Sequence, residues 1–262
     1  MAVAFDAVGP SSAGASAAGA TSLSWSHTNN GNAIIAGCAV GVGPDTGMST
    51  TATYAAVAMA AGAIVHSNAN TAGFLRVFTL ASPATGANNV VVTLTGGTGD
   101  LTGGSISVLG AGSFVTQYSG TGAADPPTAT SVGSTPGGLI CAFVCAGLPI
   151  ASATSPSTSR YIINLNGSSA AGNSGGATSP STGSNVTTAW SITSDWWAVI
   201  GVEVLPASGS DELWRYRLQP PGLLAPNHAP LPGPQGDAAA APAVAAPSAF
   251  PLPVISPLTG TF

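Results

Sequence analysis

Short runs of β-branched, aromatic and alanine residues alternate along the chain with clusters of Gly, Ser, Asn and Pro. In residues 88–96, Val90, Val92 and Leu94 fall on one side of an extended chain, while Val91 falls on the other. This period of two residues is typical of a strand with one face on a core. No long segment has the apolar period of a helix, about 3.6 residues, so the pattern predicts an all-β protein.

Ten such runs are separated by turn-forming residues. Their spacing favours a jelly-roll-like sandwich of two antiparallel sheets, formed as one domain by residues 1–206. The predicted strands are residues 21–28, 33–42, 51–59, 74–80, 88–96, 104–111, 138–147, 160–165, 188–193 and 196–205.

The connections between these runs carry their own signals. Asn30-Gly31 stands between two predicted strands and is a strong hairpin signal, and Pro83 with Gly86 indicates a chain reversal. Residues 166–188 are of low complexity and have no apolar anchor, so we expect a long exposed loop there. On the last predicted strand, Glu203 lies on the face of Trp197 and Val199, and its charge predicts that it points to solvent.

The composition changes at Pro206, after which prolines recur to the end of the chain. Such a segment cannot supply a continuous hydrogen-bond ladder or continue a helix. Residues 207–262 are therefore predicted to form an extended Pro/Ala-rich tail that docks on a partner. The docking candidates are Trp214, Arg215, Tyr216, Arg217, Leu223, Leu224, Leu231, Phe250, Leu252 and Ile255. An alternative for Trp214 and Tyr216 is that they close the bottom of the sandwich.

Charged side chains are scarce in this chain, and their scarcity excludes some classes of function. The chain has four Arg, no Lys and nine Asp or Glu, and its net charge is −5. Nucleic-acid binding and a polybasic membrane anchor both need clustered cations, so neither is expected. No apolar run is long enough to span a membrane as a helix, and the first residues lack the pattern of a signal peptide.

Candidate chemistry is also sparse. Cys38, Cys141 and Cys145 lie in apolar runs and are predicted to be buried thiols, with no metal site and no cofactor. Ser26 and His27 are neighbours on a strand and point to opposite faces, so they cannot form a catalytic dyad. The carboxylates Asp6, Asp45, Asp100, Asp125, Asp195 and Glu203 are scattered, and the chain is predicted to have no catalytic residues.

Several segments together resemble a β-sandwich module of virion proteins from phages that infect actinobacteria, often labelled minor tail proteins. They are SLSWSHTNNGNAIIAGCAVG (22–41), TATYAAVAM (51–59), FLRVFTLASPATGANNVVVTLTG (74–96) and WWAVIGVEVLPA (196–207). The resemblance covers about residues 1–206, its motifs are structural, and it implies no catalytic residues.

The sequence and this resemblance predict a non-enzymatic structural protein of a bacteriophage virion, in a minor tail or capsid-decoration role. It would be assembled in the host cytoplasm, displayed on the particle and anchored by residues 207–262. The expected partners are other tail or capsid subunits and further copies of the chain as a homo-oligomer. The alternative is a carbohydrate-binding module for a host-surface glycan, on a platform of Trp25, Tyr54, Tyr118 or Trp190. An enzyme would need two converging carboxylates, for which the sequence gives no pair.

Overall fold

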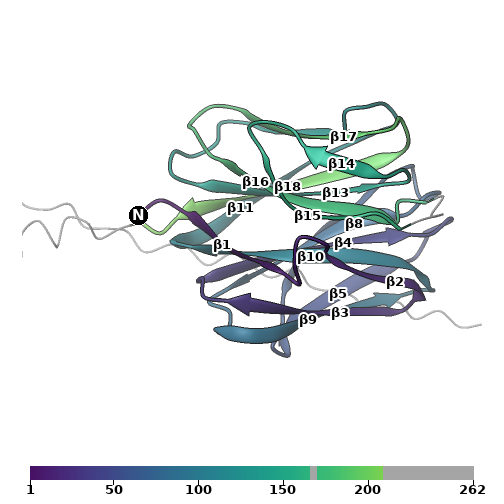
Figure 1. Cartoon of the computed structure of the whole chain (residues 1–262), viewed down its shortest axis with the longest axis horizontal. Coiled ribbons are helices and arrows are strands. Elements are labelled where there is room, and N and C mark those ends of the chain that lie inside the picture. Colours follow the sequence, from purple (N-terminus) through teal and green to yellow (C-terminus); the bar gives the residue numbers. More distant parts are fainter. Residues whose placement is uncertain (166–169, 209–262) are drawn as a thin grey trace, which may run out of the picture. The chain divides into compact units, whose positions relative to one another are not determined.

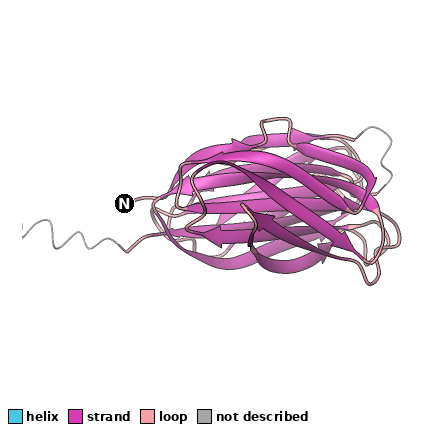
Figure 2. Cartoon of the chain, turned by 90° about the horizontal axis from the view of Figure 1, so that it is seen from below, coloured by secondary structure: helices cyan, strands magenta, loops and turns pink. Residues whose placement is uncertain are grey.

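The computed structural model describes residues 1–165 and 170–208. Within these residues the chain consists of strands joined by turns and loops and contains no helix (Figure 2). Every strand pair is antiparallel, so the predicted all-β antiparallel sandwich is confirmed. The predicted tail, apart from Ala207 and Ser208, lies outside the described residues.

The first half of the described chain forms two sheets, with strand orders β1-β10-β4-β8-β7 and β3-β9-β5-β6, and β2 pairs with β10 beside β1. The bounds are β1 Ala4–Gly9, β2 Ala15–Ala20, β3 Ser22–Asn29, β4 Ala33–Gly41, β5 Ser49–Tyr54, β6 Val57–Ala58, β7 Ala60–His66, β8 Phe74–Ala81, β9 Gly86–Thr95 and β10 Gly99–Leu109.

The second half forms two further sheets, with strand orders β11-β18-β13-β16-β15 and β12-β17-β14. The bounds are β11 Ala111–Gly122, β12 Thr128–Ser131, β13 Leu139–Ala146, β14 Ile150–Ala153, β15 Thr158–Ile163, β16 Asn173–Pro180, β17 Val186–Ile192 and β18 Trp197–Pro206.

The two halves repeat one topology. The strands of the two halves can be matched in chain order if β1 and β2 together correspond to β11. The larger sheet β1-β10-β4-β8-β7 then has the same strand order as β11-β18-β13-β16-β15. The smaller sheet β3-β9-β5 likewise has the same order as β12-β17-β14. Each half is therefore a jelly-roll-like sandwich of its own. The strand pattern predicted one sandwich over residues 1–206, whereas the described chain contains two. Gly110 joins the halves, since β10 ends at Leu109 and β11 begins at Ala111.

The four sheets stack in layers, with the two larger sheets face to face in the middle (Figure 1). One hydrophobic core lies between these larger sheets and includes Ile35, Val77, Phe143 and Ile200. Two outer cores fill the individual sandwiches, one around Trp25 and Phe78, the other around residues of β13 and β17. As a result the central strands β4 and β13 are buried along their whole length.

The contact between the halves follows an approximate two-fold symmetry. In the two-fold relation β10 is equivalent to β18, β8 to β16 and β4 to β13. The contact of β10 with β16 is thus repeated by the contact of β18 with β8, and that of β4 with β16 by that of β13 with β8. The equivalent strands β4 and β13 contact each other. This is the reciprocal pattern of an isologous interface, here formed within one chain.

The symmetry breaks where β4 and β13 meet. The segments AIIAGCAVG (33–41) and LICAFVCAG (139–147) align without a gap and place Gly37 at the position of Phe143. A Cβ added to Gly37 would lie 2.3 Å from Cδ1 of Phe143, whose side chain is fully buried. The absent side chain of one half therefore makes room for the ring of the other.

Three local predictions were wrong. Residues 173–180, predicted as part of an exposed loop, form β16, which is buried between β13 and β15. Their small side chains leave room for larger neighbours: a Cβ on Gly176 would lie 2.3 Å from Cε1 of Tyr161. Asn30-Gly31 does not close a hairpin, because β3 and β4 belong to different sheets. Residues 51–59 divide into β5 and β6 at Ala55 and Ala56, which both have positive φ.

Candidate functional site

The ten sequence-predicted docking residues all lie outside the described residues: Trp214, Arg215, Tyr216, Arg217, Leu223, Leu224, Leu231, Phe250, Leu252 and Ile255. Their role stays a prediction. The candidate site is therefore built from the described part of the chain.

Three of the four aromatic residues considered for a glycan platform belong to the core. Trp25, Tyr54 and Trp190 are 4%, 0% and 0% exposed. Tyr118 is the exception, because it is only partly buried and lines a pocket of about 370 Å³.

This pocket lies at the edge of the second sandwich. One wall comes from Val115 and Tyr118 on β11 and from Glu203 on β18, strands of the larger sheet. The other comes from Thr130 and Ser131 on β12, a strand of the smaller sheet, and from residues 132–135. The pocket thus opens between the larger and the smaller sheet of this half. We call it the Glu203 pocket.

Glu203 is the charged group of the Glu203 pocket, and the prediction that it points to solvent was wrong. The residue is 7% exposed, because its face of β18 is the inner face of the sandwich, shared with Trp197 and Val199. Oε1 accepts a hydrogen bond of 2.6 Å from the backbone N–H of Thr135. Oε2 accepts no hydrogen bond within the described residues. It is not fully buried, so it stays accessible from the pocket.

Tyr118 contributes a neutral ring. A β-bulge between Val115 and Tyr118 sets its register, and it pairs with Gly201, where a Cβ would lie 2.1 Å from Cζ of Tyr118. Its hydroxyl lies 3.3 Å from Oγ1 of Thr188, which itself donates to a backbone carbonyl. Burial raises the pKa of Tyr118, so the phenol stays protonated.

Two further features give the Glu203 pocket a mixed character. The Oγ of Ser131 is buried and has no hydrogen-bond partner among the described residues. Val132 lines the pocket with an apolar side chain that is 85% exposed. The site therefore combines an anionic acceptor, hydroxyls, an aromatic ring and apolar side chains.

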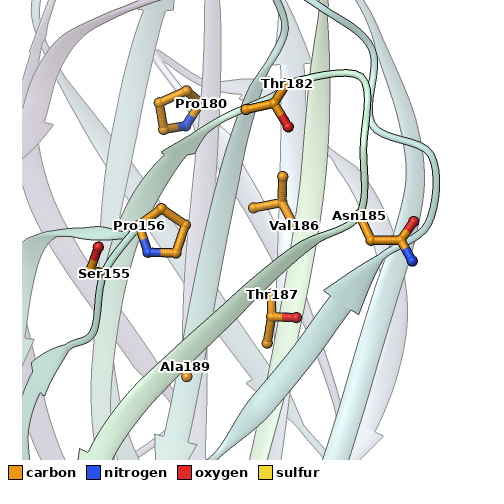
Figure 3. A pocket seen from close by; sticks show the side chains of 8 residues that line it. All are labelled: Ser155, Pro156, Pro180, Thr182, Asn185, Val186, Thr187 and Ala189. Atoms are coloured by element: carbon orange, nitrogen blue, oxygen red, sulfur yellow. The ribbon is translucent and has the colours of Figure 1, made fainter.

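A second pocket, of about 340 Å³, lies beside β17 and carries no charged side chain (Figure 3). Pro156, Pro180 and Val186 give it apolar walls, and Thr182, at the top of the view, and Asn185, at its right, add polar side chains (Figure 3). The side-chain oxygen of Asn185 is already occupied by the N–H of Gly133. This pocket offers shape without a chemical group that could catalyse or bind strongly.

A serine–histidine pair does occur, but in the core. Nδ1 of His27 lies 2.8 Å from Oγ of Ser105, which also accepts the indole N–H of Trp25. His27 is 1% exposed and Ser105 is 0% exposed, so no substrate reaches them. As expected, Ser26 points the other way and is exposed. Sequence reasoning missed Ser105 because it comes from β10, far along the chain.

A histidine–aspartate pair joins the end of β7 to the loop between β4 and β5 in the first sandwich. Nδ1 of His66 lies 2.9 Å from Oδ2 of Asp45, and the Asp45 side chain is fully buried. Oδ1 of Asp45 has no partner in the described residues. Among the described residues, Asp45 is the hydrogen-bond partner of the His66 ring, and no nucleophile is bonded to it.

The two described arginines are held without carboxylates. Arg76 donates to the carbonyls of Gly62 and Thr50 and to the hydroxyl of Ser49. Arg160 donates to Thr178 and lies over the ring of Phe5, at 3.7 Å from its centroid. Both guanidinium groups thus bind partners outside the Glu203 pocket.

The three cysteines are buried and free, as predicted. Across the described chain, no group of three or more His, Cys, Asp or Glu side chains gathers in an arrangement that could hold a metal ion. Nor does this part of the chain contain a helix long and apolar enough to cross a membrane. Comparison of the chain with models of protein families, with curated proteins and with solved structures found no match.

Proposed function

We propose that this protein is a non-enzymatic structural component of a bacteriophage virion, in a minor tail or capsid-decoration role. It is assembled in the host cytoplasm, displayed on the particle and anchored by residues 207–262. Its partners are tail or capsid subunits and further copies of the chain.

The duplicated sandwich carries this proposal. Jelly-roll-like sandwiches recur in viral capsid and lectin domains, where they present an outer surface on a rigid core. Here two of them share a continuous apolar interface, which favours a rigid body over a hinged pair. The exposed positions of β3 are Ser22, Ser24, Ser26 and Thr28, so its outer face is hydrophilic without charge. Such a surface suits display.

The buried state of His27 and Ser105 also favours a structural role over a hydrolytic one. A nucleophile and its base must reach a substrate, and this pair does not. The Glu203 pocket has one carboxylate among its lining residues, whereas glycoside hydrolysis commonly needs two on opposite sides of the bond.

Particle incorporation tests the proposal. In the phage that encodes the chain, the gene is replaced by a version that ends after Ser208, which keeps β18 and the hydrogen bond from Ala207 to Gly110. We expect the full chain in purified particles, and the shortened chain to be folded but absent from them. Mass spectrometry of particles and thermal unfolding of the purified shortened chain measure both. Absence of the full chain from particles would refute the virion role, and normal incorporation of the shortened chain would refute the anchor.

A further inference from the structure

Among the residues that the structure describes, none supplies a counter-charge to the carboxylate of the Glu203 pocket. Within the described chain the one ion pair is His66 with Asp45, and Arg76 and Arg160 are held elsewhere. A carboxylate that is 7% exposed has lost most of its hydration, and one N–H donor from Thr135 replaces only part of it. A cation would compensate the remainder.

We infer that the Glu203 pocket binds an arginine guanidinium group. The open Oε2 of Glu203 can accept from its planar fork, and the partly buried, neutral ring of Tyr118 offers an aromatic surface for the same cation. Val115 and Val132 provide apolar surface for the methylene stem of an arginine. Guanidinium is favoured over ammonium because it is more weakly hydrated and enters a partly buried site at a lower desolvation cost.

Two sources could supply this group. Glu203 lies five residues before Ser208, the last described residue, and the chain's remaining arginines, Arg215 and Arg217, lie seven and nine residues after Ser208. With about 3.3 Å per extended residue, the segment from Ser208 to Arg215 is long enough to return to the pocket. The other source is an arginine of a second molecule. The inference does not depend on the virion role.

The decisive experiment uses the full chain with Arg215→Gln and Arg217→Gln, which removes both internal competitors. The probe is ethylguanidinium, followed by NMR through the methyl resonances of Val115 and Val132. N-ethylurea is the neutral probe of matched shape. We expect saturable shifts with ethylguanidinium and at least about tenfold weaker binding of N-ethylurea, since the charge-assisted hydrogen bond to Glu203 is lost.

Two further substitutions in the same background identify the acceptor. Glu203→Gln keeps an oxygen for the N–H of Thr135 but removes the charge, and we expect it to weaken ethylguanidinium binding at least about tenfold. Asp100→Asn is the matched control, because Asp100 also accepts a backbone N–H, from Gly19, but lies in the first sandwich. It should leave binding unchanged. Absence of saturable shifts, equal binding of N-ethylurea or equal binding by the Glu203→Gln variant would each overturn the inference.

The unsubstituted chain then separates the two sources. If Arg215 or Arg217 occupies the pocket, ethylguanidinium must compete with it and binds more weakly than to the variant that lacks both. If the affinities are equal, the arginine comes from another molecule. If a variant is lost from particles but still binds ethylguanidinium, the proposed anchor fails and the Glu203 pocket does not. If a variant is incorporated into particles but no longer binds ethylguanidinium, the opposite holds.

Discussion

At the scale of single residues, His27 couples the stability of the first sandwich to pH. Burial lowers its pKa from the ordinary value of 6.5 to about 4, partly opposed by the negative charge of Asp6. Above pH 6.5 both the folded and the unfolded chain hold His27 neutral, and the stability is complete. As the pH falls from 6.5 towards 4, only the unfolded chain gains a proton. Folding should thereby lose roughly 3 kcal/mol.

Urea unfolding at pH 7 and pH 4.5 measures this loss. In the His27→Asn variant, which has no imidazole to protonate, we expect the stability to differ less between the two pH values. Ser26→Asn is the control, since Ser26 is an exposed neighbour on the same strand, and it should keep the full difference attributable to His27. An unchanged pH dependence in His27→Asn would show that other groups cause it.

Single residues also show where sequence reasoning reached the candidate site and where it stopped. The alternation along residues 196–205 correctly grouped Glu203 with Trp197 and Val199 on one face. That this face is an inner one could not be derived, because β18 is covered on both sides and both of its faces are apolar. A charged residue on an otherwise apolar, two-sided strand was the available signal for a pocket.

At the scale of elements, the crossing of β4 and β13 depends on a pair of unequal side chains. Gly37→Ala places a methyl group against the buried ring of Phe143, at a distance no side chain tolerates without movement. Overpacking of this kind typically costs about 1–3 kcal/mol. We therefore expect Gly37→Ala to lower the free energy of unfolding by that amount, measured by urea denaturation.

The double variant Gly37→Ala with Phe143→Ala tests the cause. Removal of the ring alone leaves a cavity, with an expected cost of about 3–5 kcal/mol. The added methyl group should then fill part of that space, so the double variant should be more stable than the sum of the two effects allows. Strict additivity would mean that the two side chains do not compete for the same space.

The same elements explain why the duplication was not predicted. Period-two alternation identified strands that have one polar face, such as β3 and β9, and continuous apolar runs revealed β4, β13 and β18. β16 reads as a Gly/Ser loop because its buried positions are filled by small residues under Tyr161 and Val144. Without β11 and β16, and without the short strands β12 and β14, the second half lacked the strand order that matches the first.

At the scale of the whole molecule, the shared core predicts that both sandwiches unfold together. Separation of the halves would expose one face each of β4 and β13, strands that are buried along their whole length in the folded protein. Ile35, Phe143 and Ile200 would all leave the core between the larger sheets. The exposed apolar surface would cost too much for a stable half-unfolded state, so we expect one transition.

The three cysteines lie in two different cores and can therefore report on the unfolding of each core. Cys38 lies in the core of the first sandwich, whereas Cys141 and Cys145 lie in the core between the larger sheets. All three are 0% exposed, and burial raises the pKa of each thiol to about 12, so alkylation requires opening of the structure.

Short pulses of iodoacetamide along a urea series, read by peptide mass spectrometry, should give the same midpoint for the three cysteines and for tryptophan fluorescence. Labelling of Cys141 and Cys145 at lower urea than Cys38 would show that the sheets part before the first sandwich unfolds. The duplicated halves would then be two domains in contact rather than one cooperative body.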